Sequence, residues 1–417
     1  MTALTTDSPV WRPFTQHATE PEPPVALRTE GAYIDTDRRR LIDAISSWWV
    51  ITHGHRHPPI MQAIRAASDS LDQVIFAGLT HEPAEALARE LVALAPKGLT
   101  RVFYSDSGST SVEVALKMAL GFWHSTGRPR HRIAVIEGSY HGDTIGTMSV
   151  GERGVFNAAY QPLMFAVDRI PFPRDGADTL AAFEALARGG DMAALIVEPL
   201  VLGAGGMLMY PPEILAGLRR ICDAHGVLLI ADEVMTGWGR TGRLWACDHA
   251  GIAPDIMCTS KGLTGGAIPL AATLASEAVF QAHWSQDRAR TFFHSSSYTA
   301  NPLACAAGLA NARIWAAGGM QARLDAVGAM QAERLADLAR DPRWENPRRT
   351  GTIAAIDLKV GAAGYLAAEG PRMRAHFMAR GVLLRPLGNT VYVLPPYCVT
   401  AGDLDAVWGA IAGYRAG

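Results

Sequence analysis

An apolar run ends in two carboxylates in the stretch Val227-Leu228-Leu229-Ile230-Ala231-Asp232-Glu233. Such a continuous run is typical of a strand buried on both faces, as in a parallel sheet flanked by helices. A second short apolar run ends at Lys261, in Cys258-Thr259-Ser260-Lys261-Gly262. Ligands bind at the carboxyl ends of such strands. The two stretches therefore predict an α/β fold in which Asp232 and Lys261 meet at one edge of the sheet.

An acid and an amine at neighbouring strand ends are what pyridoxal phosphate chemistry needs. The cofactor has an aldehyde that reacts with a lysine and a pyridine nitrogen that pairs with an acid. Asp232 would keep that nitrogen protonated, and burial of Lys261 among glycines and aromatic groups would lower the pKa of its amine. Taken alone, Asp232 could instead cap a helix, and an isolated lysine is most often a solvated surface group.

A loop of small residues offers a site for the cofactor's phosphate. It follows the apolar run that ends at Tyr104, and it leads into a helical pattern that begins near Val112. A helix N-terminus has free N–H groups and the positive end of the helix dipole, so we expect Gly108, Ser109 and Thr110 to bind the phosphate. Thr110 and Glu113 also have the spacing of a capping box, and both interpretations can hold together.

Two further expected strands, residues 132–136 and 193–197, end near functional groups. The first leads to Tyr140, which could stack on the pyridine ring or simply pack within its loop. The second ends at Glu198, which would be another carboxylate in the same cleft.

These motifs together resemble the class III pyridoxal-phosphate aminotransferases of fold type I, and the resemblance covers nearly the whole chain. Further motifs that carry it are Trp11-Arg12-Pro13-Phe14-Thr15-Gln16, Ser47-Trp48-Trp49, His53-Gly54-His55-Arg56-His57-Pro58, Tyr140-His141-Gly142-Asp143-Thr144, Gly237-Trp238-Gly239-Arg240-Thr241-Gly242 and Tyr298-Thr299-Ala300-Asn301-Pro302. The resemblance implies that Lys261 links covalently to the cofactor, Asp232 pairs with the pyridine nitrogen and Tyr140 stacks beside the ring. It also implies that Gly108 and Ser109 hold the phosphate, with Glu198 in the cofactor pocket.

The resemblance further implies a homodimer with shared active sites. In the family, the segment before Tyr298 completes the phosphate site of the other subunit, and here that segment reads His294-Ser295-Ser296-Ser297. Ser297 is the expected donor. The serine run differs from the glycine- and proline-containing versions of the family, which leaves open which serine contacts the phosphate.

Within the family, the opening motif and Trp48-Trp49 resemble the biotin-synthesis branch. This implies conversion of 7-keto-8-aminopelargonate to 7,8-diaminopelargonate with S-adenosylmethionine as amino donor, although lysine or another amine stays open as the donor. Arg385 would bind the substrate carboxylate through parallel hydrogen bonds. The other expected substrate contacts are Trp48, Trp49, Arg240 and Phe14, the last standing where the best-known members have tyrosine.

Three other functions fit parts of the pattern. An ω-amino-acid:pyruvate aminotransferase would use the same machinery on another substrate, and an aminomutase would keep both amines on one molecule. A transcription regulator built on this fold would need an added DNA-binding domain, for which the match beginning at Trp11 leaves no room.

Composition agrees with a globular enzyme of small molecules. The chain has 417 residues, a net charge of −2 and scattered basic residues, which argues against a nucleic-acid partner. No apolar run approaches the length that spans a membrane, and the N-terminus does not resemble a signal peptide. Five scattered cysteines are typical of a reducing compartment, so we expect a cytoplasmic protein. His53, His55 and His57 have no carboxylate or cysteine nearby in sequence to complete a metal site, so no metal is expected.

The pattern also predicts how the chain is organised. Residues 1–58 would form an N-terminal segment that joins a small domain, and residues 59–308 would form the large cofactor domain with its mostly parallel sheet. Residues 309–417 would form the remainder of a smaller α+β domain.

Overall fold

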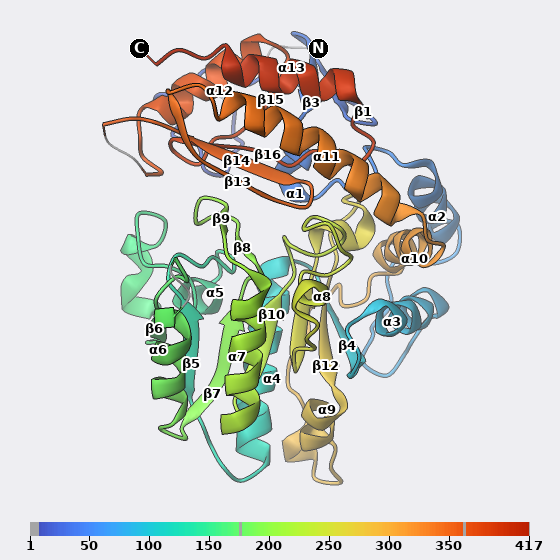
Figure 1. The fold of residues 1–417 in the computed structure, drawn as a ribbon. Helices are drawn as coiled ribbons and strands as arrows, with labels where there is room; N and C mark the ends of the chain where they lie inside the picture. Colours follow the sequence, from blue (N-terminus) through green and yellow to red (C-terminus); the bar gives the residue numbers. More distant parts are fainter. Residues whose placement is uncertain (1–7, 175–176, 362–363, 417) are drawn as a thin grey trace.

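The computed structural model describes residues 8–174, 177–361 and 364–416, which form two lobes (Figure 1). The lower lobe in that view is built on a seven-stranded sheet of order β4-β12-β11-β10-β7-β5-β6. Neighbouring strands from β11 to β6 pair in parallel, and only β12 pairs antiparallel with both of its neighbours. The strands are β4 (Leu99–Ser105), β5 (Arg132–Ile136), β6 (Asp168–Ile170), β7 (Met192–Val197), β10 (Leu228–Asp232), β11 (Ile256–Thr259) and β12 (Ala271–Ser276).

Side chains on the two faces of this sheet enter separate apolar cores. In β10, Leu229 and Ala231 join the core formed with α6 (Ala177–Ala187) and α7 (Pro212–His225). Leu228 and Ile230 join the core beneath α4 (Gly108–Ser125). Alternate residues of a strand point to opposite faces. An uninterrupted apolar run therefore becomes a central strand covered by helices on both sides, as Figure 1 shows for α7 and α4.

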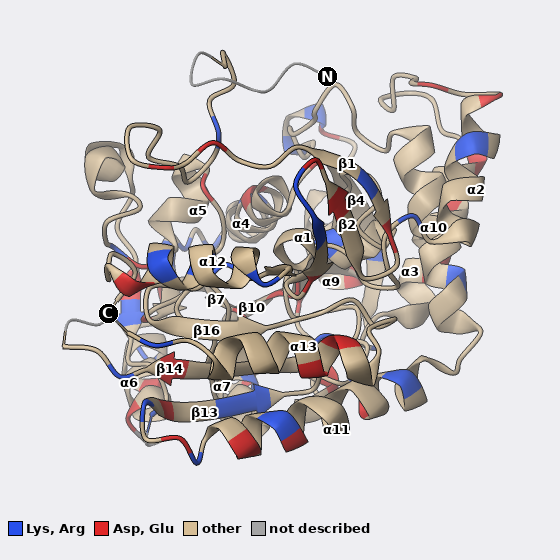
Figure 2. Ribbon diagram, turned by 90° about the horizontal axis from the view of Figure 1, so that it is seen from above, with Lys and Arg blue, Asp and Glu red and all other residues tan. Residues whose placement is uncertain are grey.

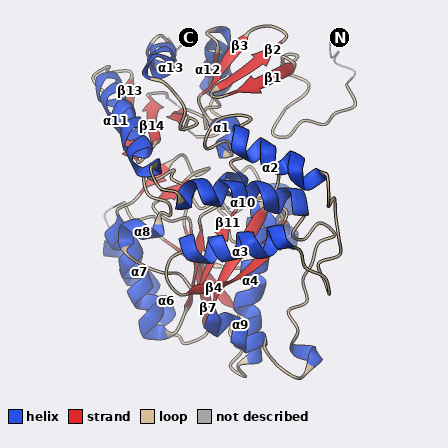
Figure 3. Ribbon diagram, turned by 90° about the vertical axis from the view of Figure 1, so that its right-hand side faces the viewer, coloured by secondary structure: helices blue, strands red, loops and turns tan. Residues whose placement is uncertain are grey.

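A layer of three helices flanks the β4 side of the lower lobe. Helix α10 (Pro302–Ala316) packs against both α2 (Pro58–Ser68) and α3 (Glu82–Leu94), and the three are seen stacked in Figure 3. The expected domain limit at residue 308 falls inside α10. The other helices of this lobe are short: α5 (Ile145–Ser149), α8 (Cys247–Ala250), α9 (Glu277–His283), and the 3₁₀ turns Ala158–Leu163, Lys261–Thr264 and Arg288–Arg290.

The upper lobe combines the two ends of the chain. A four-stranded sheet has the order β1-β2-β3-β15, in which β15 pairs in parallel with β3, and a three-stranded sheet has the order β13-β14-β16. The strands are β1 (Ala26–Glu30), β2 (Tyr33–Thr36), β3 (Arg40–Asp43), β13 (Trp344–Thr350), β14 (Ile353–Leu358), β15 (Val382–Leu383) and β16 (Thr390–Val393). The helices are α11 (Met320–Leu338), α12 (Glu369–Ala379) and α13 (Ala401–Ala412), and a small hairpin of β8 (Val201–Leu202) and β9 (Leu208–Met209) rises from the lower lobe (Figure 1).

Charged residues of both signs are interspersed over the upper lobe in Figure 2. The small net charge of −2 reflects nearly equal numbers of basic and acidic residues, 38 Lys and Arg against 40 Asp and Glu. Among the described residues, every helix is too short or too polar to cross a bilayer.

A short left-handed turn, α1 (Ser46–Trp49), connects β3 to the lower lobe. Its four residues have φ values of 52°, 45°, 68° and 74° in chain order, and none of them is glycine. Left-handed backbone costs a non-glycine residue about 1–2 kcal/mol. Such a run persists only where surrounding contacts hold it in place.

Candidate active site

A cavity of about 160 Å³ opens at the carboxyl ends of five strands of the large sheet. It brings together seven of the residues expected from sequence, namely Lys261, Asp232, Tyr140, Glu198, Gly108, Ser109 and Trp49. The remaining lining residues are Ser107, His141, Gly142, Val234 and Met235. Because these strands end at the same edge of the sheet, an amine, two carboxylates and a helix N-terminus lie around one cavity.

Lys261 follows β11 after one intervening residue, Ser260, and begins the 3₁₀ turn Lys261–Thr264. The residue is only partly exposed, and its amine is enclosed by protein atoms. Burial lowers the pKa of this amine to about 8, while the charges of Asp232 and Glu198 act in the opposite direction. Its Nζ lies 4.7 Å from the centre of the Trp49 ring.

The glycines after Lys261 allow the backbone of the left-handed turn to approach closely. A Cβ at Gly266 would lie 2.5 Å from the carbonyl oxygen of Val50, and one at Gly262 would lie 2.7 Å from Trp238 Cβ. Both separations are shorter than side-chain carbons tolerate. The glycines are thus explained by close packing, at Gly266 against the segment that follows Trp49 and at Gly262 against Trp238.

Asp232 ends β10 and is paired with a histidine that the sequence analysis did not single out. His141 Nδ1 lies 2.7 Å from Asp232 Oδ2, and the N–H of Val234 donates to Asp232 Oδ1 at 3.1 Å. Both side chains of the pair are buried. His141 Nε2 is buried and has no hydrogen-bond partner among the described residues. The only sequence signal for His141 was its place beside Tyr140 in the family motif.

Glu198 holds the loop that carries Tyr140. Its Oε1 accepts the N–H of Tyr140 at 2.8 Å, and its Oε2 accepts the N–H of Gly203 at 2.9 Å. Burial raises the pKa of Glu198 to about 7, opposed by the charge of His141 and by these two N–H groups. Burial also raises the pKa of Tyr140, whose hydroxyl stays protonated at neutral pH.

The N-terminus of α4 faces the cavity with Gly108 and Ser109. The capping box lies elsewhere than the spacing of Thr110 and Glu113 indicated, and that expectation was wrong. Ser107 is the N-cap, and its side chain accepts the N–H of Thr110 at 3.2 Å, while Thr110 Oγ1 accepts the N–H of Ser107 at 3.0 Å. Because the helix begins earlier than expected, Glu113 is free to accept Thr144 Oγ1–H at 2.6 Å.

Two glycines keep the space beside this helix end open. A Cβ at Gly108 would lie 2.7 Å from Val234 Cγ1, and one at Gly142 would lie 2.1 Å from Ser109 Oγ. A side chain at either position would have to displace a residue that lines the cavity, Val234 or Ser109. Thr110 is not among the residues that line the cavity.

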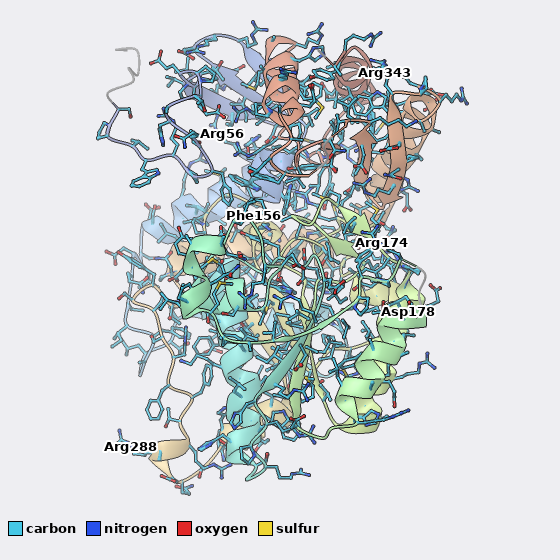
Figure 4. The ribbon with its side chains drawn as sticks, turned by 90° about the vertical axis from the view of Figure 1, so that its left-hand side faces the viewer. Arg56, Phe156, Arg174, Asp178, Arg288 and Arg343 are labelled. Atoms are coloured by element: carbon cyan, nitrogen blue, oxygen red, sulfur yellow. The ribbon has the colours of Figure 1, made fainter. Side chains whose placement is uncertain are left out.

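An outer group of aromatic residues joins the two lobes around Arg385. Phe14 lies 5.5 Å from Trp48 and 6.0 Å from Phe156, measured between ring centres. Arg385 donates to the carbonyl oxygen of Phe14 at 2.9 Å, and its guanidinium lies 5.1 Å from the Trp48 ring. Figure 4 places Phe156 where the lobes meet. The centre of the Tyr365 ring lies 4.4 Å from the centre of the Phe156 ring. Phe156 and Tyr365 had no sequence signal, because their contact joins segments far apart in the chain.

Arg240 does not line the cavity in this structure, and its expected role as a substrate contact stays a prediction. Its guanidinium is 1% exposed and donates to the carbonyl oxygens of Pro395, Trp49 and Ile51 at 3.0, 3.2 and 2.7 Å. It also lies over the Tyr397 ring at 5.0 Å. Arg240 is therefore a support for the backbone that follows the left-handed turn.

Ser297 is exposed and does not line the cavity of its own chain. The neighbouring Ser296 donates to Asp106 Oδ2 at 2.5 Å. The three histidines near the N-terminus have separate contacts. His53 bonds to Asn311 at 2.8 Å, His55 bonds to Asp43 at 2.9 Å, and His57 precedes α2 as its N-cap residue.

Comparison with known proteins matches the sequence to one family. The Aminotransferase class-III family matches residues 15–413. The adenosylmethionine-8-amino-7-oxononanoate aminotransferase of Synechococcus elongatus is 49% identical over 414 residues, which cover 97% of each chain.

Two solved structures extend the comparison to the fold. The crystal structure of the adenosylmethionine-8-amino-7-oxononanoate aminotransferase from Methanocaldococcus jannaschii superposes with a TM-score of 0.91 at 31% identity, covering 96% of each chain. An amine transaminase from an uncultivated Pseudomonas species, in its PLP-bound form, superposes with a TM-score of 0.91 at 33% identity, covering 97% of this chain and 98% of that one. With the family match spanning nearly all of the sequence, and with amine and acid meeting at the ends of adjacent parallel strands, the chain belongs to the class III aminotransferases.

Proposed function

We propose that this chain transfers an amino group to 7-keto-8-aminopelargonate to form 7,8-diaminopelargonate, with pyridoxal phosphate as cofactor and S-adenosylmethionine as donor. The observation that carries the chemistry is the convergence of Lys261 and Asp232 on one cavity from the adjacent strands β11 and β10. The substrate is supported by the relatives of that name, which match nearly the whole chain.

The residues around the cavity fit pyridoxal phosphate. Lys261 would react with its aldehyde, and Asp232 would accept a hydrogen bond from its protonated pyridine nitrogen. The N–H groups at Gly108 and Ser109 would hold the phosphate, because the first N–H groups of a helix have no partner within the helix. The bound cofactor supplies an electron sink that stabilises negative charge on the substrate carbon.

The protein's own groups supply proton transfer and orientation. An amine with a pKa of about 8 has a substantial neutral fraction near neutral pH, so Lys261 can both accept and return the proton of the substrate carbon. His141 holds Asp232 through a hydrogen bond of 2.7 Å, and Glu198 fixes the backbone of Tyr140 at the cavity wall. Each group thus approaches the reacting atoms from a rigid strand end.

Arg385 is the proposed anchor for the substrate carboxylate. Its guanidinium lies beside Trp48 and Phe14, which would contact the apolar chain between the carboxylate and the reacting carbon. Guanidinium binds carboxylate through two parallel hydrogen bonds, so the contact sets orientation as well as affinity.

A homodimer with shared sites is part of the proposal. Ile75 and Phe293 are 67% and 70% exposed, and their loops are joined by a hydrogen bond of 3.1 Å from Gln73 Nε2 to the carbonyl oxygen of Ser297. Large apolar side chains exposed on adjoining loops mark an interaction surface. A partner bound there would be close to Ser297, which we propose contacts the phosphate in the partner's site. A cytoplasmic location is also proposed, supported by five scattered cysteines that are all free.

The visible spectrum of the cofactor-loaded protein tests the function. We expect 7,8-diaminopelargonate to remove the absorbance of the lysine-linked cofactor, whereas β-alanine leaves it unchanged. Conversion by β-alanine alone would instead favour an ω-amino-acid:pyruvate aminotransferase, the alternative that the amine transaminase neighbour supports. Absence of the band in loaded protein would overturn the role of Lys261.

A further inference from the structure

The left-handed turn Ser46–Trp49 places two tryptophans at different parts of the site. Trp49 lines the cavity beside the amine of Lys261, and Trp48 lies in the outer aromatic group beside Arg385 and Phe14. Both positions depend on backbone angles that tryptophan and serine rarely adopt. Contacts from outside the turn must therefore select this conformation.

A buried carboxylate supplies two of those contacts, both to Ser47. Asp43, at the end of β3, is fully buried. Its Oδ1 accepts the N–H groups of Ser47 at 2.9 Å and Ile45 at 3.4 Å, and its Oδ2 accepts Ser47 Oγ–H at 2.7 Å. The carboxylate thus bonds both the backbone and the side chain of Ser47, in the middle of the turn.

His55 holds the carboxylate from the opposite side. Its Nε2 lies 2.9 Å from Asp43 Oδ2, within hydrogen-bond distance, and a carboxylate at that position would accept the N–H of this nitrogen. The backbone of His55 is itself fixed by reciprocal hydrogen bonds with Gly31, at 2.7 and 3.2 Å. The imidazole therefore bridges the first hairpin of the upper lobe to the turn.

We propose that Asp43 and His55 are positioning residues that hold the Ser46–Trp49 turn in its left-handed form and thereby set the affinity of the site for its amine substrate. Neither residue lines the cavity. Their effect reaches the substrate only through the rings of Trp48 and Trp49. The substrate part of this inference rests on the proposed function, whereas the restraint on the turn does not.

A matched pair of substitutions at His55 tests the hydrogen bond separately from the ring. His55→Leu removes the donor, whereas His55→Gln keeps an N–H donor near the position of Nε2. In cofactor-loaded His55→Leu we expect amide exchange of residues 44–52 to rise at least about tenfold, as hydrogen exchange reports local opening. In the same variant we expect KM for 7,8-diaminopelargonate to rise about tenfold, as for a tenfold weaker affinity. The absorbance of the lysine-linked cofactor should remain, and His55→Gln should stay near wild type in every measurement.

Several results would overturn the inference. Unchanged exchange in His55→Leu would do so, and so would a His55→Gln variant as impaired as His55→Leu. Unchanged KM with raised exchange would overturn the link to the substrate. If His55→Leu does not fold, Ser47→Ala removes one hydrogen bond from Asp43, and smaller increases in exchange and KM are then required. Failure of wild type to convert 7,8-diaminopelargonate would refute the proposed function, and the exchange comparison would still decide whether the turn is restrained.

Discussion

At the scale of single residues, burial gives Lys261 and Glu198 properties that their side chains lack in water. The pKa of Lys261 falls to about 8 and that of Glu198 rises to about 7, since enclosure by protein disfavours the charged form of each. Asp232 belongs to the same environment through its hydrogen bond to His141. The burial that suits Lys261 and Glu198 to the site therefore also makes their charged forms unfavourable for folding.

Replacing the lysine should abolish activity and stabilise the cofactor-free protein. A pKa of 10.5 lowered to about 8 corresponds to roughly 1–3 kcal/mol after allowing for partial exposure, at about 1.4 kcal/mol per pH unit. Below pH 8 both folded and unfolded chains carry the proton, so this cost is fully present. Between about pH 8 and 10.5 the unfolded chain binds more protons, so wild-type stability rises with pH. Urea unfolding of Lys261→Met should therefore show an advantage at pH 7 that disappears by about pH 10.5, and a constant advantage would contradict the assignment.

Asp232→Asn should bind the cofactor yet transfer amino groups slowly. The amide retains a similar shape but cannot keep the pyridine nitrogen protonated, and loss of one preorganised charge lowers kcat by about 10²–10³. Single-turnover absorbance with diaminopelargonate measures this loss. A variant with near-normal kcat would show that Asp232 has no electrostatic role.

At the scale of elements, the end of α4 and the strand edge of β10 fit together because Gly108 has no side chain. Its Cβ would lie 2.7 Å from Val234 Cγ1, on the loop that follows Asp232. The helix N-terminus and the acid are therefore held at a fixed separation. On the Trp49 side of the cavity, the left-handed turn is likewise held in place, by hydrogen bonds to Arg240 and Asp43.

Gly108→Ala should weaken cofactor binding by about tenfold, equivalent to about 1.4 kcal/mol. The added methyl group would displace either Val234 or the helix end, and both lie beside the proposed phosphate site. Equilibrium titration of cofactor-free protein measures the change. The double variant Gly108→Ala with Val234→Ala relieves the clash and should recover most of the affinity. No recovery would show that backbone geometry at residue 108, and not packing, sets the affinity.

At the scale of the whole molecule, the site depends on contacts between segments far apart in sequence. Phe14, Phe156 and Tyr365 come from the N-terminal segment, the large sheet's loops and the C-terminal part, and they meet where the lobes join. The proposed partner subunit adds Ser297 to this assembly. We therefore expect activity to require both lobes of the chain and both subunits of the proposed dimer.

Mixing two inactive variants tests the shared site. Lys261→Ala lacks the amine, and Ser297→Asp would place a negative charge against the partner's phosphate. A heterodimer of the two has one site with both defects and one site with neither, so random exchange should restore about a quarter of wild-type activity. Unmixed variants are the control. No recovery after confirmed subunit exchange, or full activity of Ser297→Asp alone, would contradict the proposed arrangement.

The local sequence pattern was sufficient to predict strands and helices whose limits depend only on the periodicity of their own apolar residues. The strand at Arg132–Ile136 has the expected limits, and β10 begins one residue after the start of the expected apolar run at Val227. Asp232, Lys261 and Tyr140 could be expected in one cavity because parallel strands bring their carboxyl ends to the same edge. The sequence alone thus determined the class of fold, the strand ends that carry chemistry and, through its motifs, the family.

Only the tertiary structure decided which way side chains point and what they contact. Arg240 lies within a family motif yet turns into the interior, because three backbone carbonyl oxygens there accept its N–H groups. Asp43 and His55, and likewise Asp232 and His141, become pairs only when distant segments pack together. No periodicity records such pairings, since they depend on distances between elements and not on the order of residues within one.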